Sequence, residues 1–288
     1  MENEVKVVAE VGCNHKGSLD IAKEMIRVAS LSGADAVKFQ KRNPAELLSE
    51  EQYNAPHPNP RNSYGDTYGE HREYLELTAE QHRELKKQCD EIGITYSTSV
   101  WDLNSAQQIA ELEPEFVKIP SASNQHYDML GWLREHYPGQ IQISLGMTYR
   151  EEEERVVQFF EEGGRGQDLV LYACTSGYPV PFEDLYLKEI TRLREQFGHR
   201  VGAIGFSGHH LGIAADMAAL TLGAEWIERH FTLDRTWKGT DHAASLEPDG
   251  LRRLCRDVNN VSQALAYKGE EILPIEREQR DKLKWISS

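Results

Sequence analysis

The sequence predicts a parallel (β/α)8 TIM barrel, and three observations support this fold class. Eight short runs of apolar and β-branched residues recur along the chain, and most are separated by longer amphipathic stretches. The length of 288 residues suits a single barrel, which usually takes about 250 residues. The first run is not followed by the Gly-x-Gly-x-x-Gly turn that the competing fold, a doubly wound open sheet, would favour. We therefore expect residues 1–288 to form one barrel domain.

Each predicted strand is short and mostly apolar, which is typical of strands in a parallel sheet that is covered on both faces. In chain order, the predicted strands are residues 5–11 (VKVVAEV), 35–40 (DAVKFQ), 94–99 (ITYSTS), 116–120 (FVKIP), 141–146 (IQISLG), 169–174 (LVLYAC), 201–207 (VGAIGFS) and 224–230 (AEWIERH).

Helices are predicted between these strands. The clearest are the stretches SLDIAKEMIRVASLSGA and TAEQHRELKKQCDEIG, in which apolar residues recur at helical spacing. Ser18 and Thr78 are suitable N-caps, because their hydroxyls can accept hydrogen bonds from free backbone N–H groups of the first turn. Glycines at the far ends are suitable helix stops.

One connection is much longer than the others. Residues 41–78, rich in Pro, Asn and Tyr, separate the second strand from its helix. Loops of this length inside a compact domain are usually functional or disordered. In a barrel this loop would rise from the catalytic face, so we expect either a substrate lid or a plain surface insertion. Residues 267–288 are expected to form a C-terminal tail.

The composition restricts the partners. The formal net charge is −15, which argues against nucleic acid and anionic lipid, because both need a basic surface. An anionic substrate must therefore find a local cluster of positive charge.

The expected compartment is the cytoplasm. The four cysteines, at positions 13, 89, 174 and 255, are far apart and suggest neither a disulfide framework nor a zinc site. The N-terminus does not read as a signal peptide, and no apolar run approaches the roughly 18 residues of a membrane span.

Polar residues at the strand ends carry the functional prediction, because the C-terminal ends of the strands form the catalytic face of such barrels. In chain order these residues are Glu10, Asn14, His15, Lys38, Gln40, Lys118, Ser121, Ser144, Thr175, Ser176, Tyr178, Ser207, His209, His230 and Asp241.

Two lysines among them, Lys38 and Lys118, suggest an anion site. Each taken singly would more often pair with a neighbouring carboxylate. Together with the hydroxyls of Ser144, Ser176 and Ser207, near helix N-termini, they predict a site for phosphate and carboxylate groups.

Two histidines close adjacent strands. A lone histidine is more often structural, but neutral imidazoles at His209 and His230 could hold a divalent ion that acts as a Lewis acid. Glu10 could serve as a base, position a water molecule or pair with a lysine, and its position alone does not choose among these roles.

The resemblance to a known family rests on motifs that occur in order along residues 5 to about 284. AEVGCNHKGSLDIAKEMI, ADAVKFQK, VKIPSAS, ISLGM, CTSGYP, IGFSGH and ERHFTLDRTWKGTDHAASLEP closely resemble the sialic acid (N-acylneuraminate) synthase family. TYGEHREYLEL and TLDRTWKGTDHAASLEP look most like its animal-type N-acylneuraminate-9-phosphate synthase branch.

The resemblance implies a carbon–carbon bond-forming transferase. Such enzymes condense phosphoenolpyruvate with an N-acylmannosamine, its 6-phosphate or a related mannose derivative, by metal-activated aldol-like attack and C–O cleavage. The products are a nine-carbon nonulosonic acid and phosphate.

The resemblance also implies residue roles. Mn²⁺, with Mg²⁺ or Co²⁺ as alternatives, would bind His209 and His230, and Glu10 would lie near the reacting carbons. Phosphoenolpyruvate would contact Lys38, Lys118, Ser121, Ser144 and Ser207. Gln40, Tyr178 and Asp241 match positions that contact the sugar. Ser176 stands where the family often has Asn and is expected to contact substrate.

Within the motif that opens ERHF, Glu228 and Arg229 are expected to form a structural ion pair at the barrel end. His242 is expected to be loop structure, because the family uses only the residue before it. Cys13 and Cys174 are expected to be small packing residues.

Two departures from the family pattern bear on sugar binding. Ser123 stands where the family often carries an acid. The sequence stops at Ser288, whereas family members typically continue into an antifreeze-like domain that sends an arginine into the partner's pocket. A homodimer is therefore expected only through barrel contacts.

The sugar's phosphorylation state is left open, since Arg42, Arg61, Arg72, Arg235 and Lys238 could each reach a second phosphate or be ordinary surface charge. Three competing functions remain. They are a phosphoenolpyruvate-dependent synthase of a different 3-deoxy-2-ulosonic acid, a metal hydrolase using His209, His230 and Asp241, and a non-catalytic sugar-phosphate-binding barrel.

Overall fold

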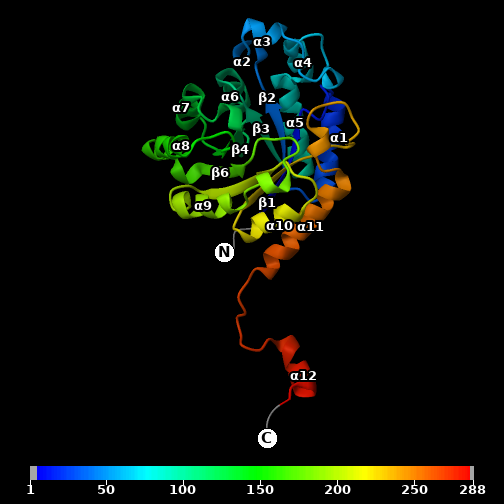
Figure 1. Ribbon diagram of the computed structural model, residues 1–288, viewed down its shortest axis with the longest axis vertical. Coiled ribbons are helices and arrows are strands. Elements are labelled where there is room, and N and C mark those ends of the chain that lie inside the picture. Colours follow the sequence, from blue (N-terminus) through cyan, green and yellow to red (C-terminus); the bar gives the residue numbers. More distant parts are fainter. Residues whose placement is uncertain (1–4, 286–288) are drawn as a thin grey trace.

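The eight predicted strands form a closed parallel barrel. The computed structural model describes residues 5–285, and its strands pair in the order β1 to β8, with β8 closing on β1 (Figure 1). The barrel prediction is confirmed. The strands are β1 (Lys6–Gly12), β2 (Ala36–Lys41), β3 (Thr95–Val100), β4 (Phe116–Ile119), β5 (Gln140–Ser144), β6 (Leu169–Cys174), β7 (Ala203–Gly208) and β8 (Trp226–His230).

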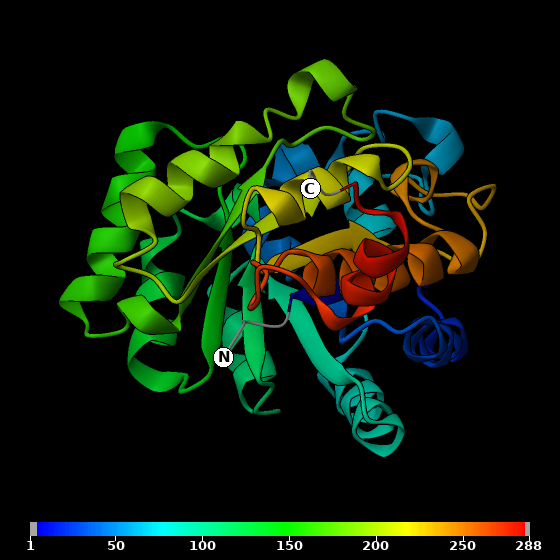
Figure 2. The ribbon, with the colours of Figure 1, turned by 90° about the horizontal axis from the view of Figure 1, so that it is seen from below.

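Helices surround the barrel (Figure 2). They are α1 (Leu19–Leu31), α5 (Ala79–Ile92), α6 (Leu103–Ala110), α7 (Tyr127–His136), α8 (Arg150–Glu162), α9 (Lys188–Phe197), α10 (Ala214–Thr221) and α11 (Pro248–Ala264). Both predicted N-caps are confirmed, since Ser18 accepts from the backbone N–H of Ile21 and Thr78 from that of Gln81.

The strand pleat divides the side chains between two environments. Alternate residues of β1, such as Val7, Ala9 and Val11, pack outward in the main apolar core with the helices. Val8 points inward and belongs to a small separate cluster with Ala36 and Phe116.

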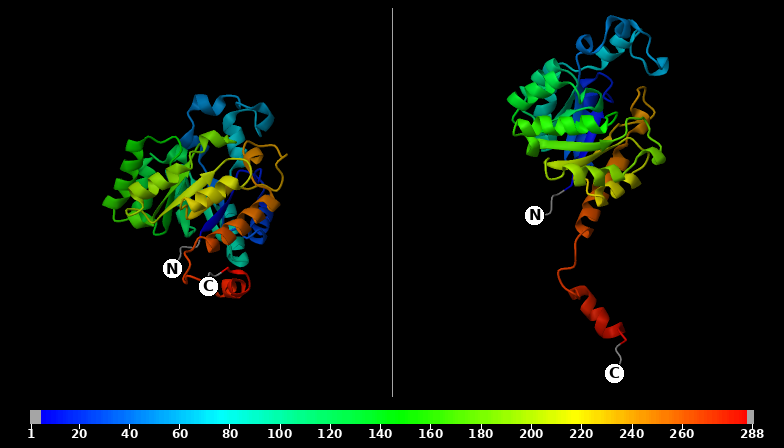
Figure 3. Two further views of the ribbon diagram at one scale, coloured as in Figure 1. Left: turned by 60° about the horizontal axis from the view of Figure 1, so that its bottom comes forward. Right: turned by 60° about the vertical axis from the view of Figure 1, so that its left-hand side comes forward.

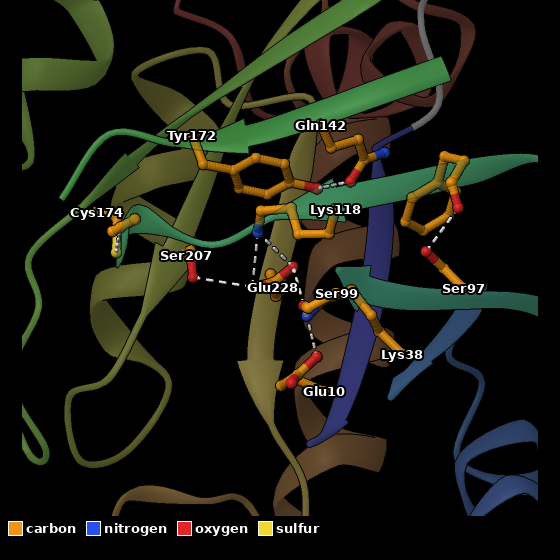
Figure 4. Close-up of polar contacts among 12 residues, drawn as sticks. Glu10, Lys38, Ser97, Ser99, Lys118, Gln142, Tyr172, Cys174, Ser207 and Glu228 are labelled. Atoms are coloured by element: carbon orange, nitrogen blue, oxygen red, sulfur yellow. Dashed lines mark hydrogen bonds and ion pairs between the residues drawn. The ribbon is translucent and has the colours of Figure 1, made fainter. Parts of the chain in front are cut away.

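Above that cluster the barrel interior is polar. The Tyr172 hydroxyl donates to Gln142 Oε1 at 2.7 Å, and the Nζ of Lys118 lies 4.0 Å from the centroid of the Tyr172 ring (Figure 4). These contacts support a charged lysine inside the barrel, below the C-terminal ends of the strands.

The strand register sets three predicted site residues side by side. Glu10 on β1 is the partner of Lys38 on β2 and of His230 on β8. Directly after Glu10 the β1–β2 register shifts, and Gly12 takes a left-handed φ of 52°, which glycine adopts without strain.

The long 41–78 connection is folded. It contains α2 (Pro44–Leu47), α3 (Glu50–Asn54), the 3-10 helix η1 (Pro60–Asn62) and α4 (Tyr68–Leu75). This connection lies at the end of the barrel where the strands have their C-terminal ends. The helix α12 (Pro274–Leu283) lies beyond the opposite end (Figure 1). The Tyr64 hydroxyl donates to the backbone carbonyl of Lys238, which ties the insertion to the segment after β8.

The C-terminal tail stands apart from the barrel (Figure 3). A segment without regular structure leads from α11 to α12, and none of the α12 residues is buried. The last three residues of the predicted 267–288 tail lie outside the described part of the chain. Among the helices of residues 5–285, none has the length and apolar character to cross a membrane.

Candidate active site

A cavity of about 310 Å³ opens at the C-terminal ends of the strands. It brings together most of the residues singled out from the sequence, from seven of the eight strands or the segments that follow them. The predicted residues that line it are Glu10, Lys38, Gln40, Lys118, Ser121, Ser144, Ser176, Tyr178, Ser207, His209 and His230.

Asp241 does not line this cavity. It follows β8 by eleven residues and accepts a hydrogen bond from the hydroxyl of Thr240 at 2.8 Å. Cys13 is half-buried nearby, and the pKa of its thiol is raised chiefly by burial. The charge of Arg42 opposes this rise, and the negative charges of Glu76 and Asp241 add to it. The structure therefore places Asp241 near the rim of the site.

The floor of the cavity holds two buried ion pairs (Figure 4). Lys38 contacts the carboxylate of Glu10, and Lys118 donates to both carboxylate oxygens of Glu228 at 2.8 and 2.9 Å. The four side chains are at most 7% exposed, and Lys38 Nζ lies 3.8 Å from Glu228. The two lysines and two carboxylates form a compact, balanced group that we call the floor quartet.

Hydroxyl groups complete the hydrogen bonds of the floor quartet. Lys38 donates to Ser99 Oγ at 2.6 Å, and Ser207 donates to Glu228 Oε1 at 3.0 Å. Buried charges need both an opposite charge and hydrogen bonds, and Lys38, Lys118 and Glu228 obtain them from one another and from these two serines. Glu10 is paired with Lys38 and accepts from the Gln40 amide through Oε1, while its Oε2 has no hydrogen-bond partner among the described residues.

The two carboxylates differ in proton affinity. Burial raises the pKa of Glu10, and the charge of Lys38 only partly opposes that rise. Burial also acts on Glu228, but Lys118 and Lys38 outweigh it and lower the pKa of Glu228 to about 2. Glu228 therefore stays ionised as a counterion, whereas Glu10 is the better proton acceptor.

The expected ion pair between Glu228 and Arg229 is wrong. Neighbouring residues of a strand point to opposite faces, so Glu228 enters the barrel and Arg229 faces the helices. There Arg229 donates to Asp216 Oδ2 at 2.5 Å and lies 3.0 Å from His210 Nε2, and it is fully buried.

The sequence reasoning missed Glu228, Ser99, Trp101 and Met147 as cavity residues. The signal for Glu228 was its position two residues before His230 on one strand, which puts both side chains on the same face. Cys174 was expected only to pack, but it also lines the cavity, where its Sγ accepts from the Ser121 hydroxyl at 3.9 Å.

Opposite Glu10, three serines make a hydroxyl-rich wall. Ser121 Oγ accepts from the backbone N–H of Gly146 at 3.0 Å. A Cβ at position 146 would lie 2.4 Å from Ser176 Oγ and 2.7 Å from Ser121 Oγ, so only glycine fits. Ser144 is the third serine of this wall, which offers hydroxyl and backbone donors to an anion.

His209 and His230 lie beside each other, with ring centroids 5.3 Å apart. Burial, and then the charge of His230, lower the pKa of His209 to about 3, so its imidazole is neutral at physiological pH. Nδ1 of His209 lies 3.2 Å from the carbonyl of Thr175, and Nδ1 of His230 is buried without a partner among the described residues.

These two imidazoles fit a divalent ion that takes two protein nitrogens and completes its coordination with water or substrate. Residues 5–285 contain no group of three or more His, Cys, Asp or Glu side chains arranged to hold a metal ion. The donor set offered by the protein is therefore the histidine pair.

The remaining polar residues at the rim have structural contacts. The Asn14 amide donates to Ser245 Oγ and to the carbonyl of Phe231, and His242 Nδ1 lies 2.8 Å from Thr232 Oγ1. His242 begins the short 3-10 helix η5 (His242–Ala244) in the segment after β8. Ser123 donates to the carbonyl of Trp101 at 2.8 Å, so it supports a cavity wall.

Comparison with known proteins agrees with this geometry. Residues 25–270 match the model of the NeuB family. The chain is 38% identical over 277 residues to N-acetylneuraminate-9-phosphate synthase of Homo sapiens, covering 96% of this chain and 76% of that protein. It is 34% identical to N,N'-diacetyllegionaminic acid synthase of Campylobacter jejuni, covering 90% of this chain and 77% of that one.

A solved structure has the same architecture. The N-acetylneuraminic acid (sialic acid) synthetase of Leptospira borgpetersenii, in complex with citrate, superposes with a TM-score of 0.83 at 27% identity. The match covers 98% of this chain and 93% of that one.

Proposed function

The chain belongs to the NeuB family, and on that premise we propose that it condenses phosphoenolpyruvate with an N-acylmannosamine or a related mannose derivative. The products are a sialic acid-type nonulosonic acid and inorganic phosphate. The observation that carries this proposal is the cavity in which Lys38 and Lys118 meet a hydroxyl-rich wall and Glu10.

Phosphoenolpyruvate carries a carboxylate and a phosphate close together, and the site offers donors to both. Lys38, Lys118 and the hydroxyls of Ser121, Ser144 and Ser207 face the same cavity. Each lysine is paired with a carboxylate, so the substrate would contact the remaining N–H groups of the lysines, and such charge-assisted hydrogen bonds are stronger in a buried site than in water.

In the reaction, C3 of phosphoenolpyruvate forms a bond to the aldehyde carbon of the open-chain sugar, which leaves C2 electron-poor. Water adds to C2 and loses a proton to Glu10, whose raised pKa suits a base. The C2–O bond to phosphate then breaks as the C2 hydroxyl gives its proton to the phosphate departing beside Lys38 and Lys118, and C2 becomes the keto carbon. The former aldehyde oxygen, an alkoxide once the carbon–carbon bond has formed, takes up a proton that balances the one Glu10 received from water, and becomes a hydroxyl.

We propose that His209 and His230 hold a divalent ion, with Mn²⁺ as the first choice and Mg²⁺ or Co²⁺ as alternatives. When bound, such an ion supplies Lewis-acid polarisation of the sugar carbonyl. Tyr178 packs against both rings, with centroids 4.4 and 5.8 Å away, and so restricts their orientations.

The position of the sugar phosphate follows from carbon counting. A three-carbon unit joined to C1 of a six-carbon sugar makes carbon 6 of the sugar carbon 9 of the product. The human relative is named a 9-phosphate synthase, and this supports a 6-phosphate of the N-acylmannosamine as the substrate.

The proposal is tested by phosphate release. The protein is incubated with phosphoenolpyruvate, Mn²⁺ and a panel of mannose derivatives, each with and without a 6-phosphate. Release with an N-acylmannosamine is expected, and excess chelator should abolish it until Mn²⁺ is restored. Release only with a different aldose would identify another ulosonic acid synthase, and no release with any aldose would favour a non-catalytic binding protein.

The metal site has its own test, since Mn²⁺ binding can be followed by calorimetry without turnover. His230→Ala should lose measurable Mn²⁺ binding, whereas the exposed His199→Ala control should bind like wild type. Native Mn²⁺ affinity in His230→Ala would remove the histidine pair from the metal site.

We also propose a reducing compartment, the cytoplasm, and a homodimer that forms through barrel contacts. All four cysteines are free thiols, which supports the first proposal. Sedimentation velocity at several protein concentrations tests the second, and a single monomeric species throughout would exclude it.

A further inference from the structure

We propose that Arg72, on α4 of the 41–78 insertion, is the specificity-determining residue that contacts the phosphate at the far end of the sugar. This inference rests on the proposed function, and it concerns which residue distinguishes a phosphorylated from an unphosphorylated sugar.

Arg72 lies against the wall of the cavity. Its guanidinium carbon is 5.5 Å from the ring centroid of Trp101, which lines the cavity, and 5.0 Å from that of Tyr68. The Tyr68 hydroxyl accepts from Nε at 3.0 Å and from Nη2 at 2.7 Å. These contacts hold the guanidinium in one orientation, and its Nη1 has no hydrogen-bond partner among residues 5–285.

The charge of Arg72 is not neutralised by a salt bridge in the described part of the chain. This sets it apart from Arg42, which is buried and paired with Glu76 at 2.5 Å. Because no carboxylate of the described residues neutralises it, the Arg72 guanidinium is available to an anionic ligand.

The surroundings of Arg72 carry further positive charge. His71, the preceding residue, is buried, and its pKa is lowered to about 4 by burial first and then by His57, Arg42, Arg72 and Lys238. Since Arg42 is paired with Glu76, Arg72 and Lys238 supply most of the positive electrostatic potential at this part of the rim. A phosphate dianion is attracted by the same potential that disfavours a protonated His71.

The direction of the substrate agrees with this position. The reacting C1 end of the sugar must lie near the floor quartet and the histidine pair, so its C6 end points out toward the rim. Trp101 connects the two regions, because it lines the cavity and its ring also lies 5.5 Å from the guanidinium carbon of Arg72. A guanidinium there presents a planar, charge-assisted donor to phosphate oxygens.

The other cations at the rim are less suitable. Arg235 donates to the carbonyl of Ala243 and is exposed, and Lys238 lies 4.7 Å above the ring of Tyr64. Neither Arg61 nor Arg72 lines the cavity itself, but Arg61 is exposed on η1, whereas Arg72 is half-buried against the cavity residue Trp101. The Arg61→Gln variant therefore serves as a control, because this substitution removes the same charge from the same insertion.

The experiment compares kcat/KM for N-acetylmannosamine 6-phosphate and for N-acetylmannosamine in wild type, Arg72→Gln, Arg72→Lys and Arg61→Gln. Loss of a charge-assisted contact to phosphate should lower kcat/KM of Arg72→Gln for the phosphorylated sugar by about 10- to 100-fold. The unphosphorylated sugar should be nearly unaffected. Arg72→Lys should retain part of the preference, and Arg61→Gln all of it.

Other results would contradict either the role of Arg72 or the proposed function. Equal losses for both sugars in Arg72→Gln would make Arg72 a packing residue, and an unchanged preference would exclude it from the phosphate contact. If Arg72→Gln does not fold, Arg72→Lys decides, because a full loss or full retention of preference with native thermal stability contradicts the proposal. Wild type that turns over neither sugar would instead overturn the proposed function itself.

Discussion

Glu10 lies in a row of three cavity-lining side chains that crosses β2, β1 and β8, between Lys38 and His230. Its Oε1 also accepts from the Gln40 amide at 3.2 Å. This carboxylate combines a raised pKa with a position beside a cation, which are the properties expected of a base that is ionised at rest and protonated during turnover.

Glu10→Gln should therefore preserve substrate binding and lose turnover. The amide has the same shape but cannot accept the proton, so kcat should fall by about 100-fold or more while KM changes little. Steady-state phosphate release measures both constants, with the exposed Glu50→Gln as a control. Near-normal turnover of Glu10→Gln would remove Glu10 from the mechanism.

Some of the residues that line the cavity could be predicted from the sequence, and others could not. Lys38, Lys118, His209 and His230 were predicted because a barrel gathers its strand ends at one face. Glu228 was assigned to the wrong partner, because opposite charges at adjacent positions resemble an ion pair while the pleat of β8 separates them. The partners of Lys118 depend on packing across the barrel, which no local pattern contains.

Among the elements, the insertion at 41–78 is the one whose internal structure could not be predicted from the sequence. Its position was predicted, but its helices were not, because elements of four to eight residues are too short to display helical periodicity. The available signals were the capping boxes that begin with Ser49 and Thr67. The contact between Tyr64 and Lys238 was beyond prediction, since it joins segments far apart in the sequence.

The packing of α5 on β3 predicts a dependence of stability on pH. His82 is fully buried, and its pKa is lowered to about 3, by burial first and then by Lys41. In the unfolded chain an ordinary histidine has a pKa of about 6.5. The unfolded state therefore binds more protons below pH 6.5, and the folded state loses stability as the pH falls from 6.5 toward 3.

His82→Gln should remove this part of the acid sensitivity. Between pH 7 and pH 5 its free energy of unfolding should fall by about 2 kcal/mol less than that of wild type. Urea unfolding at both pH values measures the difference, and the exposed His136→Gln provides the control. Identical pH slopes in wild type and His82→Gln would show that His82 is not the group responsible.

At the scale of the whole molecule, the barrel and the tail behave as separate parts. The α12 helix has no buried residue, whereas α11 buries Leu251, Leu254, Cys255 and Val258 against the barrel. Hydrophobic burial dominates stability, so only the second of these helices should matter to it.

Removal of residues 267–288 should change the free energy of unfolding by less than about 1 kcal/mol, because residues 267–285, the described part of this tail, include no buried residue. Removal from residue 248 onward, which deletes α11 as well, should abolish cooperative unfolding. Thermal and urea unfolding of both truncated proteins check this pair of outcomes. A large loss of stability in the shorter truncation would show that α12 does pack on the barrel.

The register that sets Glu10 beside His230 has a consequence for biosynthesis. These residues lie on the first and last strands of the barrel, so the base is synthesised long before its imidazole neighbour. At about 5 to 20 residues per second, the roughly 220 residues between them take on the order of 10 to 40 s to add. A nascent chain that has not yet completed β8 has neither the closed barrel nor Glu228 and His230. It therefore remains catalytically silent until β8 has been synthesised and has closed on β1.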